Sequence, residues 1–509
     1  MSGLVGGNVR VRAPAGLDPA AGAHSNFRSR AAELLAREPF LVFVLALDAL
    51  VLTIRLPELF VGSDTWLALV GGRQVWSGGL PRHDTITIWS HGARWVDQQW
   101  LGQLLFYGIH SVGGLRLLLL VHAALLVGSF ALALTFARRA GASSRSVALV
   151  GVVGLFVAFP SSAVRTQALA YPLFITLFWL LATDARKPTR RVFLALPLLV
   201  LWANVHGSAA LGAGLVVVWG IAELVQAGRR RDAGSARVRA IVLAVAAPLC
   251  LLASPYALSL PGYYRDVLGA GAFRDVVSEW GPTTFPAQWP FFVLALSALW
   301  LAGRKARRLS LFEHLALLCT LLAGLDAVRN MVWCAFVAAM VVPRALDGVW
   351  PVKEAPFRRR VNLALSLGAL AVLVGAFGAI AARPGGRYAP DYPRRAADAV
   401  AQATARDSSA RVLANERFAD WLLWRVPRLS GRVAFDARFE LLSSGQLRAI
   451  SHFRNHSSAD WLAAADGYRL LVLDPRDEKR AIRVVLHEFG TRQLYRDRHV
   501  AVLLRKGQP

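Results

Sequence analysis

Cysteine and methionine are scarce in this chain, whose 509 residues include only three of each. The cysteines, Cys250, Cys319 and Cys334, each lie inside an apolar run, and no two of them form a CxxC pair or another close-spaced metal-binding pattern. A disulfide framework or a structural zinc site is therefore not expected. The three thiols are predicted to act as small buried apolar groups.

Acidic residues are also few: 32 Asp and Glu stand against 58 Lys and Arg, which gives a formal charge of +26. Such an excess can indicate nucleic-acid binding, but here the basic residues lie in short runs between apolar segments instead of along one surface. This distribution is typical of the cytoplasmic loops of a membrane protein. We therefore expect no nucleic-acid partner.

The N-terminal segment, residues 1–38, lacks the apolar core and the small-residue cleavage site of a signal peptide. It is rich in Gly, Ala and Arg. These features favour a disordered cytoplasmic arm.

Apolar residues are abundant, at 55% of the chain, and they fall in long blocks. Because a helix of about 20 apolar residues crosses a bilayer, residues 39–382 are predicted to form about eleven transmembrane helices. The basic runs fall on alternate connections, so one orientation places the N-terminus in the cytoplasm and the polar loop 61–110 outside. The sequence thus predicts an all-α, multi-pass domain in the plasma (inner) membrane.

One apolar stretch, residues 192–225, is too long for a single crossing, since it would measure about 50 Å as one helix. It is interrupted by the polar motif WANVHGS. Two short helices joined at NVHG fit this stretch better.

The C-terminal segment, residues 383–509, alternates short β-type runs with helical ones. The predicted strands are RVLAN (411–415), RVAFDAR (432–438), YRLLVLD (468–474) and the final RHVAVLLRK, and the predicted helices are ADWLLWR, ELLSSGQLRAISHF and EKRAIRVVLHEF. This order favours a small α/β domain with a mainly parallel sheet. With eleven crossings before it, the domain is expected to be extracytoplasmic, on the same side as loop 61–110.

Loop 61–110 combines tryptophans and carboxylates at a membrane surface, which suits a sugar or a lipid headgroup. The alternative interpretation is an ordinary interfacial belt of Trp with solvated charges. Asp64 lies only a few residues beyond the first crossing, where a carboxylate could act as general base on an acceptor hydroxyl. Asp84 could equally be a turn or cap residue, and Asp97 could pair with Arg94. Candidate substrate-binding residues in this loop are Trp66, Arg73, Asp84, Trp95 and Asp97.

The other outer turns carry isolated polar side chains, and charges this close to the hydrocarbon tend to line a polar cavity. Arginine suits a phosphate or diphosphate, because its planar fork makes paired hydrogen bonds. The alternative for each residue is an interfacial anchor or an interhelical hydrogen bond. The candidates are Arg165, Asn204, His206, Glu279 and Arg329.

Several of these motifs together resemble a known superfamily. The first outer loop has the form D-x-W, G-R, G-x-L-P-x-x-D and W-x-x-x-x-W-L, here Asp64 to Trp66, Gly72-Arg73, GGLPRHD and Trp95 to Leu101. Later segments, VRTQALAYPLF, WANVHGS, SPYAL, SEWGP and VAFDARFE, add to the likeness. The chain thereby resembles polytopic bacterial membrane proteins of the glycosyltransferase C-type (GT-C) superfamily over residues 40–509.

The resemblance implies a transferase that takes a sugar from a polyprenyl-phosphate donor on the outer face of the membrane, with Asp64 as the catalytic base. The acceptor would be a glycan, lipid or protein of the cell envelope. Two departures bear on this: no Asp-Asp or Asp-x-Asp pair stands at this position, and Gln99 replaces an acid expected before Trp100-Leu101. A divalent metal is thus compatible with the family but unsupported by the residues, and no cofactor is predicted.

Two further hypotheses come from other functional classes. A transporter or flippase for a lipid-linked glycan would use the same basic residues without a catalytic carboxylate, but the chain shows no internal repeat of the kind common in transporters. A non-catalytic scaffold for envelope assembly would use the C-terminal domain for docking.

Overall fold

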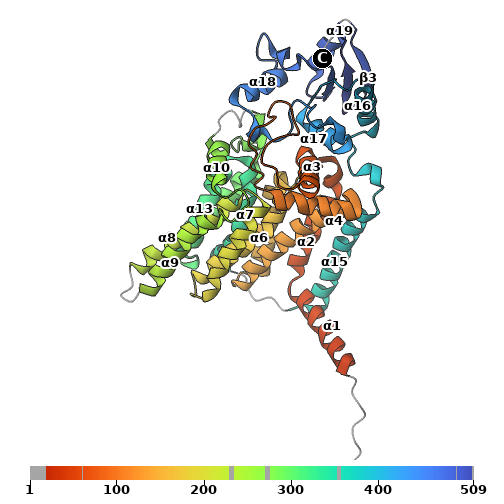
Figure 1. Cartoon of the computed structure of the whole chain (residues 1–509). Coiled ribbons are helices and arrows are strands. Elements are labelled where there is room, and N and C mark those ends of the chain that lie inside the picture. The colour runs from red at the N-terminus through yellow and green to blue at the C-terminus, as the bar shows by residue number, and fades with distance from the viewer. Residues whose placement is uncertain are drawn as a thin grey trace, which may run out of the picture.

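The computed structural model describes residues 19–59, 61–228, 234–269, 276–351, 357–488 and 490–506. A bundle of helices forms one part, and a small α/β domain sits on one end of it (Figure 1). The predicted fold class, an all-α membrane domain followed by a small α/β domain, is confirmed.

The membrane domain and its first outer loop consist of helices. They are α2 (Pro39–Leu59), α3 (Ser63–Gly78), α4 (Trp100–Arg139), α5 (Ser144–Ala158), α6 (Gln167–Asp184), α7 (Ala195–Val205), α8 (Ala209–Ala227), α9 (Gly234–Cys250), α10 (Leu260–Gly269), α12 (Trp289–Arg304), α13 (Leu311–Asp326), α14 (Met331–Val349) and α15 (Arg359–Ala382). The stretch 192–225 is divided into α7 and α8 at His206–Ser208, as its length and its NVHG motif predict.

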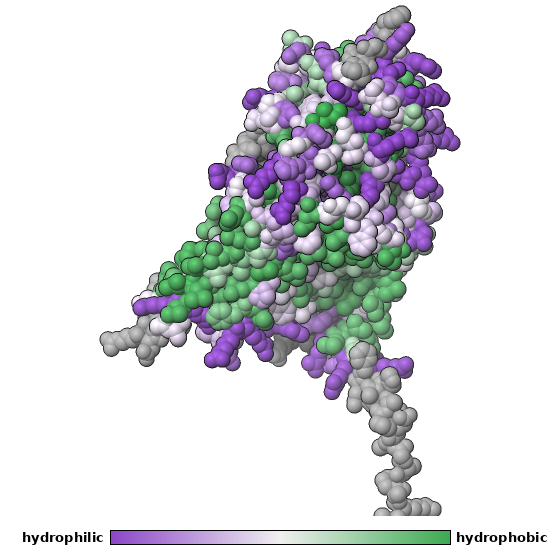
Figure 2. Space-filling view, in the orientation of Figure 1, coloured by the Kyte–Doolittle hydropathy of each residue, from purple (hydrophilic) through white to green (hydrophobic). Residues whose placement is uncertain are grey.

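Six helices in the described part of the chain are long and apolar enough to cross a bilayer. They occupy different places in the bundle, since 78% of the most apolar window of α14 is buried but only 17% of that of α15. On the face shown in Figure 2, apolar side chains form a band across the bundle, with hydrophilic surfaces on both sides of it. The chain is a multi-pass membrane protein, but the predicted number of eleven crossings is not confirmed.

Two predicted irregular segments are helical instead. The first outer loop contains α3 and the first part of α4, which changes direction at Gly113-Gly114. The N-terminal arm, predicted to be disordered, forms helix α1 (Pro19–Arg37) over its second half, while residues 1–18 lie outside the described residues. Helix α1 is held by α15: Glu33 pairs with Arg359, and the Ser366 hydroxyl donates to the Leu35 carbonyl. Local composition does not reveal such contacts between residues that are distant in the sequence.

The C-terminal domain is built on a four-stranded sheet of order β1-β2-β4-β3, formed by β1 (Val412–Ala414), β2 (Leu470–Leu473), β3 (Arg492–Arg496) and β4 (Ala501–Leu504). Its helices are α16 (Arg394–Arg406), α17 (Glu416–Arg425), α18 (Ser444–Asn455) and α19 (Lys479–His487). Only β1 and β2 are parallel, whereas β4 runs antiparallel to both of its neighbours. The prediction of a mainly parallel sheet is therefore wrong.

The predicted strand 432–438 is the second difference in this domain. Its residues make only isolated bridges, from Val433 to Thr87 of the first outer loop and to Val412. The amides of Ile88 and Trp89 donate to the carbonyls of Val433 and Ala434 at 2.8 and 2.9 Å. Because these segments are hydrogen-bonded, the first outer loop and the C-terminal domain lie on the same side of the membrane, as predicted.

Candidate active site

Asp64 lies in the first turn of α3, at the end of the membrane domain that carries the C-terminal domain. The turn is fixed by Thr65, whose hydroxyl donates to the Val164 carbonyl at 2.6 Å and accepts from the Gly62 amide at 3.2 Å. This places the start of α3 beside the outer turn that carries Arg165. The Asp64 side chain remains 45% exposed, so its carboxylate is open to a ligand.

Arg165 joins two carboxylates that are distant in the sequence. Its Nη1 lies 2.6 Å from a Glu279 oxygen and 3.3 Å from an Asp64 oxygen. Burial by itself lowers the pKa of Arg165, but the two carboxylates outweigh it and the net shift is upward. Burial likewise raises the pKa of Glu279, and Arg165 reverses this to a net decrease. Both groups are therefore charged at neutral pH.

Arg329 and His206 approach the same cluster from other outer turns. The Arg329 guanidinium stacks on Trp280, 4.4 Å from the ring centre. Burial first, and then the positive charges of Arg329 and Arg165, lower the pKa of His206 to about 3, so its ring is neutral. The Ser208 amide donates to His206 Nδ1 at 3.1 Å, which assigns the ring proton to Nε2. Arg165 and Arg329 are thus both near enough to His206 to lower its pKa. That the three line one cavity open to the lipid remains a prediction.

The C-terminal domain contributes acidic groups that were not among the predicted site residues. Asp64 is close enough to both Asp420 and Glu440 to raise their pKa values, although burial is the larger cause for each. Burial and neighbouring charges bring the pKa of Glu440 to about 7. The signal for Glu440 was the VAFDARFE motif, which the sequence singled out without assigning a role to its charges.

Asp84 and Trp95 connect the first outer loop to the C-terminal domain, which departs from their predicted substrate-binding role. The Asp84 carboxylate is fully buried; it accepts hydrogen bonds from the Ile86 amide and the Thr87 hydroxyl and pairs with Arg438 at 2.9 Å. The Arg438 guanidinium also stacks on the buried Trp95, 4.3 Å from its ring centre. Both predicted residues are thus engaged by one arginine and have no surface free for a sugar.

The sequence suggested that Asp97 pairs with Arg94. In the structure, Asp97 is buried within the loop and does not pair with Arg94. Its carboxylate accepts from the Gln103 side chain at 3.0 Å, and Arg94 instead donates to Ser259. The pKa of Asp97 is raised to about 7, mainly because the carboxyl group is buried. Asn204 is also occupied, since it accepts from Trp100 Nε1 at 3.0 Å and donates to two backbone carbonyls.

Arg73 and Trp66 lie on α3 but contact the C-terminal domain. Arg73 donates to the carbonyls of Leu423 and Trp424 at 2.8 and 3.0 Å, at the end of α17. Trp66 is 3% exposed and meets Tyr392 edge to face. Of the candidates from the sequence, the structure gathers Asp64, Arg165, His206, Glu279 and Arg329 in one cluster and gives the remaining ones contacts that support the fold.

No group of three or more His, Cys, Asp or Glu side chains is arranged to hold a metal ion within the residues that the structure describes. The carboxylates of Asp64 and Glu279 are instead paired with the Arg165 guanidinium. What the cluster can do chemically is hold an anionic group at Arg329 and His206 while Asp64 meets a second ligand from the exposed side.

No family model and no curated protein matches the chain. Among solved structures, it resembles the archaeal oligosaccharyltransferase AglB from Archaeoglobus fulgidus, in complex with an inhibitory peptide and a dolichol-phosphate, with 12% identity and a TM-score of 0.54. That match covers 85% of this chain and 69% of AglB. ArnT from Cupriavidus metallidurans, bound to undecaprenyl phosphate, matches with 14% identity and a TM-score of 0.48, over 95% of this chain and 98% of ArnT.

At these identities the comparison concerns the fold alone. AglB is a GT-C glycosyltransferase, so the GT-C resemblance identified in the sequence motifs is confirmed at the level of the fold.

Proposed function

We propose that the protein is a membrane glycosyltransferase that moves a sugar from a polyprenyl-phosphate donor to an acceptor of the cell envelope. The observation that carries this proposal is the half-exposed Asp64 carboxylate beside the buried Arg165 and the partly buried Arg329, in a chain with a GT-C fold. The cluster offers a proton acceptor and anion-binding groups within one site, which are the two functions that sugar transfer from a phosphate requires.

In the proposed reaction, Asp64 takes the proton of an acceptor hydroxyl as its oxygen forms a bond to the anomeric carbon of the sugar. The bond from that carbon to the phosphate oxygen breaks, and the electron pair leaves with the polyprenyl phosphate. Arg329 and the Nε2–H of His206 stabilise the charge that develops on the leaving phosphate. Arg165 orients Asp64, since it holds both Asp64 and Glu279.

The proposed location of this reaction is the outer face of the plasma membrane. The alternate basic loops support it, because they assign the connections opposite the C-terminal domain to the cytoplasm. Single-cysteine labelling of intact cells at an exposed residue such as Asp466 tests the orientation. Labelling only after lysis would place the C-terminal domain, and with it the site, in the cytoplasm.

The activity is tested with purified full-length protein and a synthetic polyprenyl-phosphate sugar, with transfer to envelope acceptors and donor binding measured in parallel. Transfer together with binding supports the transferase. Donor binding without transfer to any acceptor favours a transporter or flippase, and the absence of both favours a scaffold.

A further inference from the structure

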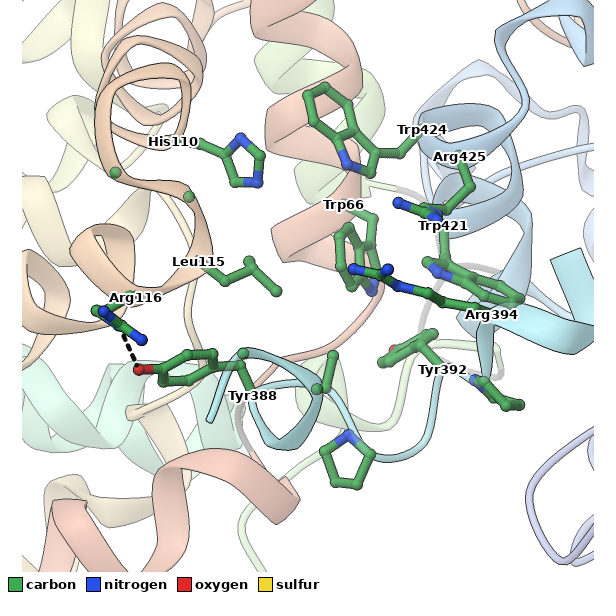
Figure 3. Close-up of a pocket in the computed structure, with 17 residues that line it drawn as sticks. Trp66, His110, Leu115, Arg116, Tyr388, Tyr392, Arg394, Trp421, Trp424 and Arg425 are labelled. Carbon is green, nitrogen blue, oxygen red and sulfur yellow. Dashed lines mark hydrogen bonds between the residues drawn. The ribbon is translucent and has the colours of Figure 1, made fainter. Parts of the chain in front are cut away.

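A cavity of about 570 Å³ lies where the C-terminal domain meets the membrane domain, and none of the proposed catalytic residues lines it. Aromatic rings form much of its wall: Trp66 from α3, Trp421 and Trp424 from α17, and Tyr388 and Tyr392 from the segment after α15 (Figure 3). The volume is within the range of sites that enclose small ligands or headgroups.

The charges around this cavity are all of one sign. Arg116, Arg394 and Arg425 line it, and no Asp or Glu occurs among the described residues of its wall. Arg116 donates to the Tyr388 hydroxyl at 3.1 Å, whereas Arg394 and Arg425 make no hydrogen bond or ion pair with another described residue. Figure 3 shows these two guanidinium groups directed toward the space beside Trp66. Like charges held together without a carboxylate favour an anionic ligand.

The position of the cavity identifies its level relative to the bilayer. Its wall includes Gly113-Gly114, where α4 turns into its most apolar part, and Gly385-Gly386, shortly after the lipid-facing α15 ends at Ala382. Val112, next to the bend, is 83% exposed although it is apolar. Since α4 bends at this wall and α15 ends just before it, we place the cavity at the depth of lipid headgroups.

We propose that this cavity binds the phosphate headgroup of an anionic glycerophospholipid from the surrounding bilayer, at a site separate from the Asp64 cluster. Arg394 and Arg425 bind the phosphate, and the aromatic wall contacts the glycerol part of the headgroup, while the acyl chains lie along α15. Basic pockets beside transmembrane helices recognise anionic lipids in this way. The proposal goes beyond the transferase function and does not depend on it.

The test uses full-length protein in detergent, to which phosphatidylglycerol or phosphatidylcholine is added, with bound lipid counted by native mass spectrometry. We expect preferential binding of phosphatidylglycerol. At about a fivefold contribution for each arginine, the double variant Arg394→Gln/Arg425→Gln should bind it about twenty-five-fold more weakly. Arg394→Lys/Arg425→Lys should retain part of the preference, which separates loss of charge from loss of structure.

The matched control is Arg395→Gln/Arg406→Gln, which removes the same charge from exposed positions of α16 that do not line the cavity. Equal binding of both lipids to the wild type, or an equal loss in the control, would overturn the proposal. Competition arms identify the source of the anion. Displacement by millimolar inorganic phosphate would indicate a free-anion site, and binding of polyprenyl phosphate in preference to phosphatidylglycerol would indicate a second donor-lipid site; either would overturn the assignment to a glycerophospholipid.

Discussion

At the end of the membrane domain that faces away from the C-terminal domain, Glu313 is fully buried between Arg344 and Arg186, and its carboxylate also accepts from the Ser310 amide at 2.8 Å. At the opposite end, Arg165 is the buried member of the ion-pair cluster, while Asp64 and Glu279 are 45% and 37% exposed. An enclosed carboxylate can only support the structure, whereas an exposed carboxylate oriented by a buried arginine is available to a substrate.

The largest effect is expected on sugar transfer, from a mutation at the end that carries Asp64. Asp64→Asn keeps the shape of the side chain but removes the proton acceptor, so sugar transfer should fall by about a hundred- to ten-thousand-fold. Donor binding and thermal stability should change little, because Asp64 is half-exposed. The matched control is Asp266→Asn, an exposed carboxylate of α10. Transfer that survives Asp64→Asn at the wild-type rate would eliminate Asp64 as the base.

At the opposite end of the membrane domain, around Glu313, mutation should lower the folding stability of the protein. Glu313→Gln leaves the buried Arg344 without its counter-charge, which typically costs about 3–5 kcal/mol of folding free energy. Thermal unfolding in detergent would measure the loss. Glu279→Gln is the comparison variant, and its loss should be less than half as large because Glu279 is partly exposed and Arg165 keeps Asp64 as a partner. Similar losses in both variants would remove the distinction between the two ends.

A third prediction concerns pH. The folded protein holds the pKa of Asp97 at about 7, above the ordinary value of 3.8 that applies when the chain is unfolded. The folded state therefore binds the extra proton, and its stability should fall as the pH rises from about 4 to 7, with a slope of at most about 1.4 kcal/mol per pH unit from this group. Asp97→Asn should flatten that part of the curve. A decline unchanged in the variant would assign it to other groups, of which Glu440 is the next candidate.

The smallest expected effect is that of metal removal. Because Asp64 and Glu279 are both bound to Arg165, we expect the reaction to need no divalent ion. Transfer should be the same in EDTA as in magnesium or manganese. A requirement for either ion would mean that Arg165 releases a carboxylate when substrate binds.

Several features were predictable because the bilayer restricts where they can lie. Arg165, His206 and Arg329 each lie in a short turn between apolar segments, and the thickness of the hydrocarbon leaves such turns only two surfaces. The division between α7 and α8 follows from the same length argument. These predictions needed no knowledge of contacts between distant residues.

The remaining features depend on long-range contacts that local patterns do not contain. The alternating residues 432–438 resemble a strand, but they pair with the first outer loop as well as with β1. Strand β3, RQLYR, has an arginine at each end and no buried residue, and it is ordered by its pairing with β4. Asp84 and Asp64 are both loop carboxylates in the sequence. The hydrogen bonds of Asp84 to Ile86 and Thr87 are local, but its ion pair with Arg438 comes from the C-terminal domain and is not visible in the local pattern.

The hydrogen bonds between the first outer loop and residues 430–434 also bear on how the protein is made. Ser430 donates to the Thr85 carbonyl across a separation of 345 residues. During synthesis the loop emerges long before its partner segment exists, and it must wait until the last membrane helix has been made. A chain interrupted before residue 430 would therefore leave the loop without this partner segment.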